Sequence, residues 1–249
     1  MQNICKTIVL LFITVVISVV MSGCGRVINR TAERKIRDVL PVYLGPAKVW
    51  RAHVDNNAMR TLGGKLSVIT IDGEDVQLQH TIECQQLHIV MHDADVDVMR
   101  GKLKSVGPTS FSVLITQQSL NQFLQSFQYP EGDRLKIKHV GIQKGLLTLN
   151  MTWNLLGKDW SFTITGQPEL AGGNKLELEP NKLSVLGIPA PLPVSALRYV
   201  ARFFNHAFDF SSLPFPVYIT KAVADNNQVQ LSGTADVMKS LNEMISSSR

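Results

Sequence analysis

Apolar residues recur at every second position through most of this chain, and that period constrains the fold more than any other feature. Successive side chains of a strand point to opposite sides, so the alternation is typical of strands with one apolar and one polar face. Gly, Asn and Asp separate several runs, at 72–73, 172–174 and 226–227, and predict hairpin turns there. The chain is therefore predicted to form a long antiparallel sheet.

The clearest alternating positions lie between residues 66 and 231. They are Leu66, Val68, Val76, Leu78, His80, Ile82, Leu87, Ile89, Met91, Leu147, Leu149, Met151, Trp153, Phe162, Ile164, Leu176, Leu178, Leu183, Val185, Val217, Ile219, Val229 and Leu231.

Four segments have apolar residues at the helical period instead and are predicted as short amphipathic helices. They cover about 29–39, 117–127, 193–208 and 236–245. Pro41 is expected to end or kink the first, and Thr116 and Asp236 can cap the second and the fourth. About ten strands against roughly 45 helical residues leave more apolar sheet than the helices can cover. Either the sheet closes on itself, or it leaves an apolar groove for another molecule to fill.

Residues 1–26 have the pattern of an export signal. Lys6 precedes an apolar run from Ile8 to Met21, which is shorter than the about 20 residues of a spanning helix. The run Met21-Ser22-Gly23-Cys24 resembles the bacterial lipobox. That resemblance implies cleavage before Cys24 and acylation of this cysteine, for example with palmitate. Plain secretion or an uncleaved anchor is the alternative.

The expected organisation follows from this signal. Residues 1–23 would be a lipoprotein signal peptide, and residues 24–45 an acylated cysteine, a basic tether and a short helix. No Pro, Gly or Ser-rich linker interrupts the remainder, so residues 46–249 are predicted to form a single domain. The expected location is the bacterial cell envelope, with the choice among inner, outer and sole membrane left open.

Charge and cysteine usage narrow the function classes. Lys and Arg number 25 against 20 for Asp and Glu, and the basic residues are dispersed, which argues against a nucleic-acid partner. Of the three cysteines, only Cys84 remains after Cys5 is removed with the signal and Cys24 is acylated. No disulfide framework is therefore expected, and Cys84 is predicted to be a small buried core residue.

No pattern in the chain predicts catalysis or metal binding. The dense polar cluster His92, Asp93, Asp95 and Asp97 lacks the glycine and glutamate of an EF-hand loop and is predicted to be a solvated sheet edge. Nucleophile-elbow, zinc-protease and phosphate-loop motifs do not occur, and the six histidines lack ligand spacing. We expect a protein that is not an enzyme and has no catalytic residues, no metal and no cofactor.

Four short runs carry a family resemblance. Gly64-Lys65-Leu66-Ser67-Val68 lies within 58–73, and runs at 115–124, 175–180 and 211–217 follow in order. Together they resemble the LmeA-like phospholipid-binding family of bacterial envelope proteins, over about residues 46–235. This family is similar to tubular lipid-binding proteins such as BPI. The resemblance implies an α+β fold in which a long, strongly curved antiparallel sheet wraps around a few amphipathic helices and holds lipid tails.

The expected binding residues come from the apolar stripes and the basic start. Bound phospholipid would contact Leu66, Val68, Leu78, Leu87, Ile89, Leu120, Phe123, Leu124, Leu147, Leu149, Leu197, Val200 and Phe204. A dry core built from the same residues is the alternative. Cations after the anchor would contact headgroups or the membrane surface, or else form a solvated helix face or tether: Arg26, Arg30, Arg34, Lys35 and Arg37.

The expected function is that of an envelope lipoprotein that binds phospholipid acyl chains in an apolar groove, for lipid transfer or envelope maintenance. Its partners would be phospholipid and the membrane surface, with any protein partner unknown. The alternative is a non-enzymatic structural or assembly lipoprotein whose apolar sheet face binds a protein.

Overall fold

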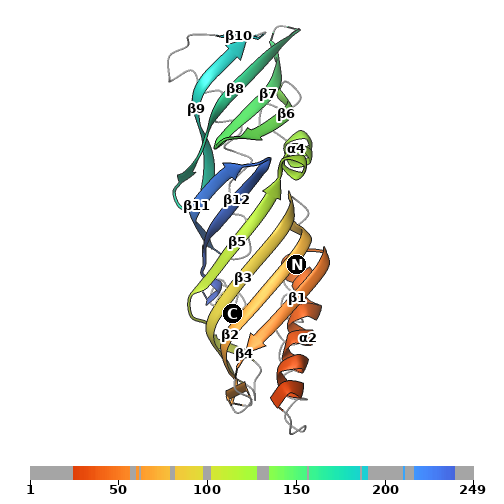
Figure 1. Cartoon of the computed structure of the whole chain (residues 1–249), viewed down its shortest axis with the longest axis vertical. Coiled ribbons are helices and arrows are strands. Elements are labelled where there is room, and N and C mark those ends of the chain that lie inside the picture. Colours follow the sequence, from red (N-terminus) through yellow and green to blue (C-terminus); the bar gives the residue numbers. More distant parts are fainter. Residues whose placement is uncertain are drawn as a thin grey trace, which may run out of the picture. The chain divides into compact units, whose positions relative to one another are not determined.

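The computed structural model describes residues 25–56, 60–61, 63–78, 82–97, 102–127, 135–155, 157–185, 187–189, 210 and 216–238. Cys24, the predicted helix 193–208 with Leu197, Val200 and Phe204, and most of the predicted helix 236–245 lie outside these residues. The elements are α2 (Gly25–Tyr43), β1 (Ala47–Asp55), β2 (Lys65–Leu78), β3 (Ile82–Asp97), β4 (Lys102–Ser105), β5 (Thr109–Thr116), α4 (Gln117–Ser126), β6 (Leu135–Gln143), β7 (Leu146–Leu155), β8 (Lys158–Ala171), β9 (Lys175–Val185), β10 (Ile188–Pro189), β11 (Val217–Asp225) and β12 (Gln228–Ala235) (Figure 1).

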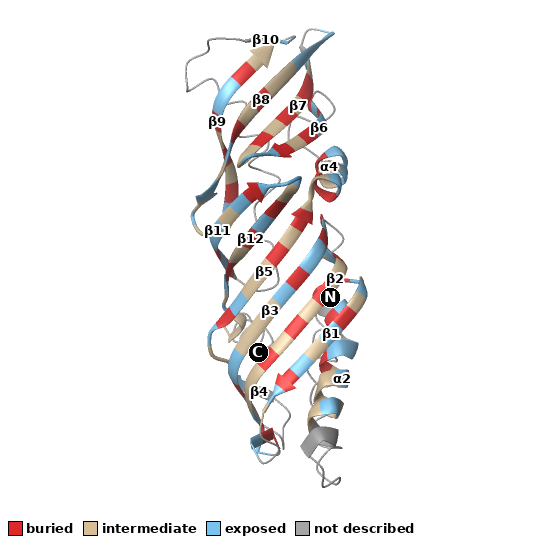
Figure 2. Cartoon of the chain, in the orientation of Figure 1, coloured by how far each residue is buried: buried red, intermediate tan, exposed pale blue. Residues whose placement is uncertain are grey.

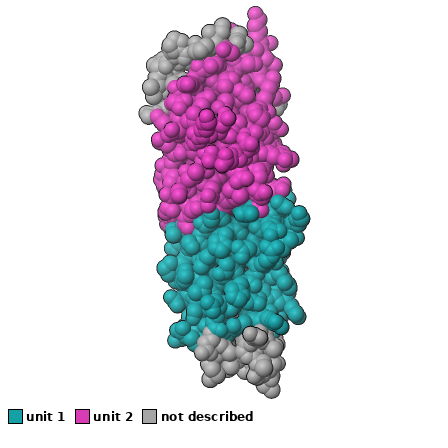
Figure 3. All heavy atoms as spheres, in the orientation of Figure 1, with its two compact units in different colours: residues 1–80, 86–112, 234–249 teal, residues 81–85, 113–233 magenta. Residues whose placement is uncertain are grey.

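The chain divides into two compact units, which Figure 3 colours separately. The first unit comprises residues 1–80, 86–112 and 234–249, and the second comprises 81–85 and 113–233. In the first unit the strands run in the order β1-β2-β3, with β4 beside β3. The second unit holds residues 113–116 of β5, residues 228–233 of β12 and all of β11, which are neighbours in the order β5-β12-β11, and a separate five-stranded sheet that runs β10-β9-β8-β7-β6.

The prediction of a mostly antiparallel sheet protein with few helices is confirmed. Adjacent strands pair antiparallel in β1–β2, β3–β4 and throughout the five-stranded sheet. In the described residues, one strand order ends on β1 and β11 and the other ends on β10 and β6. Each sheet therefore has two different edge strands and is open. Of the two expected outcomes for uncovered apolar surface, closure of the sheet on itself is therefore wrong.

Two of the three predicted turns are confirmed, and one is wrong. Residues 172–174 connect β8 to β9, and residues 226–227 connect β11 to β12. Asp72 and Gly73 instead lie inside β2, where Gly73 pairs with Trp50 of β1. A Cβ atom on Gly73 would lie only 2.6 Å from Cζ3 of the Trp50 ring. This glycine therefore makes room for an indole across the sheet rather than for a turn.

Pro41 does not end the first helix, so this part of the prediction is wrong. Helix α2 includes Pro41 and continues to Tyr43. Proline removes only its own N–H donor, and the residues after it still bond the preceding turn, since Leu44 N–H donates to the Leu40 carbonyl at 2.8 Å. Gly45 follows with a φ of 104°, which ends the helix. The alternative, a kink at Pro41, stays a prediction.

Helix α4 caps the free edge of β6 with a ladder of side-chain amides. Asn121 Nδ2 donates to the Val140 carbonyl at 2.9 Å, and the Val140 N–H donates to Asn121 Oδ1 at 2.7 Å. Gln117 Oε1 accepts from the Ile142 N–H at 2.8 Å, and Gln125 Nε2 donates to the Lys138 carbonyl at 2.7 Å. Four helical residues rise about 6 Å and two strand residues about 6.6 Å, so this spacing matches along both elements.

Helix α2 caps the edge of β1 in the same way. Glu33 Oε1 accepts from the Val54 N–H at 3.0 Å, and Asn29 Nδ2 donates to the Asn56 carbonyl at 3.0 Å. Figure 1 shows α2 alongside β1 and α4 alongside β6. Unpaired edge strands invite pairing with other chains. In each unit, a helix with polar side chains four residues apart occupies such an edge.

Candidate functional site

One face of the five-stranded sheet is apolar across four neighbouring strands. Its register places Val140 beside Leu149, Leu149 beside Ile164, and Ile164 beside Leu183. All four side chains are at most 4 % exposed. Figure 2 shows buried positions alternating with exposed or intermediate ones along β6, β7 and β8.

The opposite face of this sheet is polar. Thr163 Oγ1 donates to Asn150 Oδ1 at 2.8 Å across β7 and β8, and the hydroxyls of Thr148 and Thr165 lie 3.3 Å apart. The sheet is thus amphipathic, as expected for antiparallel strands with one face packed and one face in water.

The predicted binding residues of the second unit lie at covered positions of this unit. Leu147 and Leu149 are fully buried on the apolar face, and Leu120 and Leu124 of α4 are 2 % and 0 % exposed. Strand β11 contacts β6, β7 and β8 within the same unit. An acyl chain could reach these four leucines only by displacing the protein atoms that cover them.

Phe123 differs from its neighbours on α4. Its side chain is half-buried, and its ring centroid lies 5.7 Å from that of Phe127 in an edge-to-face arrangement. This predicted residue therefore offers apolar surface without rearrangement.

The apolar face is only partly covered at the end where β7 leads into β8. We call this the aromatic end and define it as Trp153, Trp160 and Phe162. Trp153 pairs with Trp160, and Phe162 pairs with Met151 in the next row. Trp153 and Phe162 are half-buried with ring centroids 6.5 Å apart, and Trp160 is 40 % exposed. Sequence reasoning assigned none of the three to the binding site, although both Trp153 and Phe162 fit the apolar alternation.

The predicted residues of the first unit are spread over β2 and β3. Leu87 is buried, whereas Leu66, Val68, Leu78 and Ile89 are half-buried. Ile69 and Ile71 of β2 are buried, and they have the opposite parity to Leu66 and Val68. Both faces of β2 therefore carry apolar side chains, and period two alone does not tell which face is the inner one.

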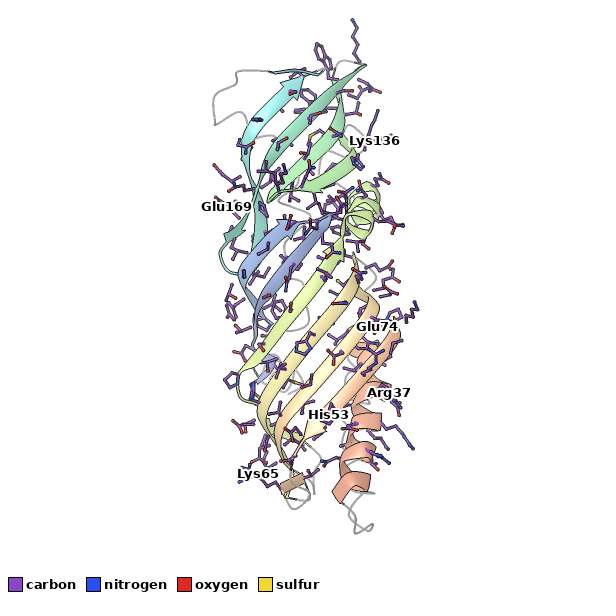
Figure 4. All side chains as sticks on the ribbon, in the orientation of Figure 1. Arg37, His53, Lys65, Glu74, Lys136 and Glu169 are labelled. Atoms are coloured by element: carbon purple, nitrogen blue, oxygen red, sulfur yellow. The ribbon has the colours of Figure 1, made fainter. Side chains whose placement is uncertain are left out.

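The half-buried face of β2 also carries charge. Asp72 Oδ1 lies 2.7 Å from His88 Nδ1, and Arg51 Nη1 donates to Glu74 Oε1 at 2.6 Å. All four side chains are at least 42 % exposed, so each pair contributes at most about 1 kcal/mol to stability. Figure 4 labels Glu74 on this polar surface.

The predicted membrane-contact cations lie on α2. Arg30, Arg34 and Arg37 are exposed and Lys35 is half-buried, while the side chain of Arg26 lies outside the described part of the chain. The stripe formed by Asn29, Glu33, Ile36 and Leu40 faces β1 through the hydrogen bonds above and through buried Ile36 and Leu40. The three arginines occupy a neighbouring exposed stripe of α2, and Figure 4 labels Arg37 on this helix.

Cys84 is a core residue, as predicted. Its side chain is fully buried, and this burial raises the pKa of the thiol from 9.0 to about 12, with the Glu83 carboxylate adding to the rise. A thiol with so high a pKa is a poor nucleophile at neutral pH.

The predicted polar cluster does not form a metal site among the residues that the structure describes. No three His, Cys, Asp or Glu side chains gather closely enough there to hold an ion. His92 and Asp93 are exposed, and Asp93 takes a φ of 49° where β3 is irregular. The broader expectation of no metal, no cofactor and no catalysis stays a prediction.

Within the described residues, no helix combines the length and the apolar character that crossing a bilayer would require.

Comparison with known proteins gives one match. The model of the family described as LmeA-like phospholipid-binding matches residues 22–234, most of the chain. Neither the curated proteins nor the solved structures give a match.

Proposed function

Because the chain belongs to the LmeA-like phospholipid-binding family, we propose that it holds phospholipid acyl chains against the apolar face of its five-stranded sheet. The observation that carries this proposal is the apolar face itself, which passes from fully buried Leu149 and Ile164 to half-buried Phe162 and Trp153. An acyl chain that lies against the half-buried rows gains contacts without breaking the covered core. The proposal includes the strongly curved sheet that the family resemblance implies, since curvature turns an apolar face into a groove.

The proposed role is lipid transfer or maintenance of a bacterial envelope. Each acyl CH₂ that leaves water is worth about 0.8 kcal/mol, so a phospholipid that enters water alone exposes two chains at a cost well above 20 kcal/mol. A protein surface about as apolar as the bilayer makes the exchange nearly neutral and lowers its barrier. Such a role needs no catalysis, no cofactor beyond the bound phospholipid and no nucleic acid.

The proposed location is the cell envelope, with Cys24 acylated after removal of residues 1–23. Two features support it: the lipobox-like run 21–24 and the stripe of Arg30, Arg34 and Arg37 that follows on α2. Asn29 and Glu33 hold α2 to β1, which leaves these arginines exposed near the anchored end of the chain. Each cation close to an anionic leaflet contributes about 1 kcal/mol.

Binding of a phospholipid with a fluorescent acyl chain to residues 26–249, in the absence of vesicles, tests the proposal. Wild type is expected to bind about one lipid per chain at saturation, since one face serves one lipid. Phe162→Ser should weaken binding about tenfold or more, because it removes about 1.5 to 3 kcal/mol of apolar contact. Tyr218→Ser, at an exposed position on β11, is the matched control and should bind like wild type.

Two outcomes would contradict the proposal. The first is a wild-type chain that binds no phospholipid. The second is a Phe162→Ser chain that binds as tightly as the control, which would show that the lipid does not lie on this face. A protein that co-purifies on the same face in place of lipid would support the assembly-factor alternative.

A further inference from the structure

Two hairpin turns lie at one end of the five-stranded sheet. Leu155 pairs with Lys158 across the β7–β8 turn, and Val185 pairs with Ile188 across the β9–β10 turn. Gly157 and Gly187 adopt positive φ values of 78° and 79° in these turns, and no atom lies within 4 Å of the Cβ that either would carry. Among the described residues, the space beside both glycines is therefore open.

An exposed tryptophan lies directly behind these turns. Trp160 is 40 % exposed and shares one side of β8 with exposed Lys158, two residues earlier. An indole combines a large apolar ring with an N–H donor, which is why tryptophan is enriched where a bilayer meets water.

The described charged residues at this end of the sheet are mostly basic. Lys136 and Lys158 are exposed, and Lys136 lies at the start of β6, beside the β7 row that precedes Trp153 (Figure 4). The one described carboxylate nearby, Asp159, accepts a hydrogen bond from Asn154 Nδ2 at 2.7 Å. Among the residues described at this end, two lysines against one carboxylate complement an anionic leaflet.

We propose that this end of the second unit docks on an anionic phospholipid bilayer, with Trp160 at the interface and with Lys136 and Lys158 against the headgroups. The inference rests on the proposed function and adds to it the surface at which lipid enters or leaves. A half-buried apolar row, Phe162 and Trp153, follows directly behind Trp160 on the same face. An acyl chain drawn from the bilayer would therefore pass from Trp160 onto apolar surface without crossing water.

The test uses the full exported chain, reconstituted with vesicles of phosphatidylglycerol whose acyl chains carry bromine, which quenches indole emission on contact. The difference between wild type and Trp160→Phe gives the quenching at position 160. In a matched chain the tryptophan is moved along β8 by combining Trp160→Phe with Leu170→Trp. Leu170 is 39 % exposed and lies at the other end of this strand, next to the Glu169 labelled in Figure 4.

Quenching is expected to be about threefold or more stronger at position 160 than at position 170, since only the first would lie in the interface. The double change Lys136→Glu and Lys158→Glu should lower quenching at Trp160 in phosphatidylglycerol vesicles and leave it unchanged in phosphatidylcholine vesicles. Lys144→Glu, in the turn at the other end of β6 and β7, is the charge control and should have no effect.

Equal quenching at positions 160 and 170, or quenching at Trp160 that the lysine reversals do not change, would overturn the docking proposal. The acyl-binding assay on residues 26–249 contains no vesicle and reads the proposed function separately. A chain that binds phospholipid in that assay but shows no preferential quenching at Trp160 overturns the docking surface alone. A chain that docks but binds no phospholipid overturns the proposed function alone.

Discussion

At the residue scale, Gly73 is the position where the sequence predicts a hairpin turn and the structure has a strand. Asp-Gly between alternating runs is a strong hairpin signal, yet this glycine sits inside β2 opposite Trp50. A Cβ there would lie 2.5 Å from Val76 Cγ2 and 2.6 Å from Trp50 Cζ3. Glycine is needed here because the ring of Trp50, on another strand, fills the space of a side chain. The residues next to Gly73 in the sequence do not show this.

Gly73→Ala is therefore expected to destabilise the protein. Trp50 is a rigid, buried ring and must shift, which costs about 1 to 3 kcal/mol, and the lower chain entropy of alanine offsets only part of this. Chemical denaturation measures the free energy of unfolding. Gly141→Ala in β6 is the control, because the nearest atom to its Cβ would be 3.9 Å away. Equal stabilities of the two variants would contradict this explanation.

Cys84 supports a second prediction at this scale. Its folded pKa of about 12 lies above the ordinary value of 9.0, so the folded state retains the thiol proton more strongly than the unfolded state. The stability from this group is therefore present below pH 9.0 and is lost as pH rises towards about 12. A thiol reagent should leave Cys84 of native residues 26–249 unmodified at neutral pH and modify it after unfolding. Rapid modification of the folded protein would show that the thiol is exposed.

At the element scale, the strands and the helix after Thr116 could be predicted, whereas their edges could not. Thr116 Oγ1 accepts from the Ser119 N–H at 3.1 Å, as the capping signal predicts. The amides of Gln117, Asn121 and Gln125 read only as the polar side of an amphipathic helix. Their role as a hydrogen-bond ladder depends on β6, which follows later in the chain and contacts α4 only in the folded protein.

Asn121→Leu tests this ladder. It leaves both the N–H and the carbonyl of Val140, which is fully buried, without their side-chain partners, at about 1 to 3 kcal/mol for each group. The free energy of unfolding should fall by about 2 to 6 kcal/mol, and the Val140 amide should lose protection from hydrogen exchange. Gln122→Leu, on the exposed side of α4, is the matched control and should keep both close to wild type. Unchanged exchange at Val140 in Asn121→Leu would contradict the edge-capping role.

At the scale of the whole molecule, the family and the amphipathic sheets could be predicted from short runs and period-two patterns. The site was harder to locate, because both faces of β2 are partly apolar and because Leu147 and Leu149 are fully covered. Period two marks which residues share a face, but it does not tell how much of that face the protein covers itself. The half-buried row at the aromatic end emerges only once Trp153, Trp160 and Phe162 are placed across two strands.

The proposed anchor and the proposed binding site should be separable, because they lie in different parts of the chain. Cys24→Ala should abolish incorporation of radiolabelled fatty acid into the exported chain, because acylation needs the cysteine sulfur. Phospholipid binding by residues 26–249 should persist, since the apolar face lies far along the chain in residues 135–185. Labelling that survives Cys24→Ala would contradict the proposed acylation site.

Native mass spectrometry of residues 26–249, purified without detergent, is the decisive test of phospholipid binding. We expect a folded chain that carries about one phospholipid, since one apolar face serves one lipid. Chloroform extraction of the same sample should release that lipid. A folded chain that is free of lipid in both measurements would contradict the proposed binding of phospholipid.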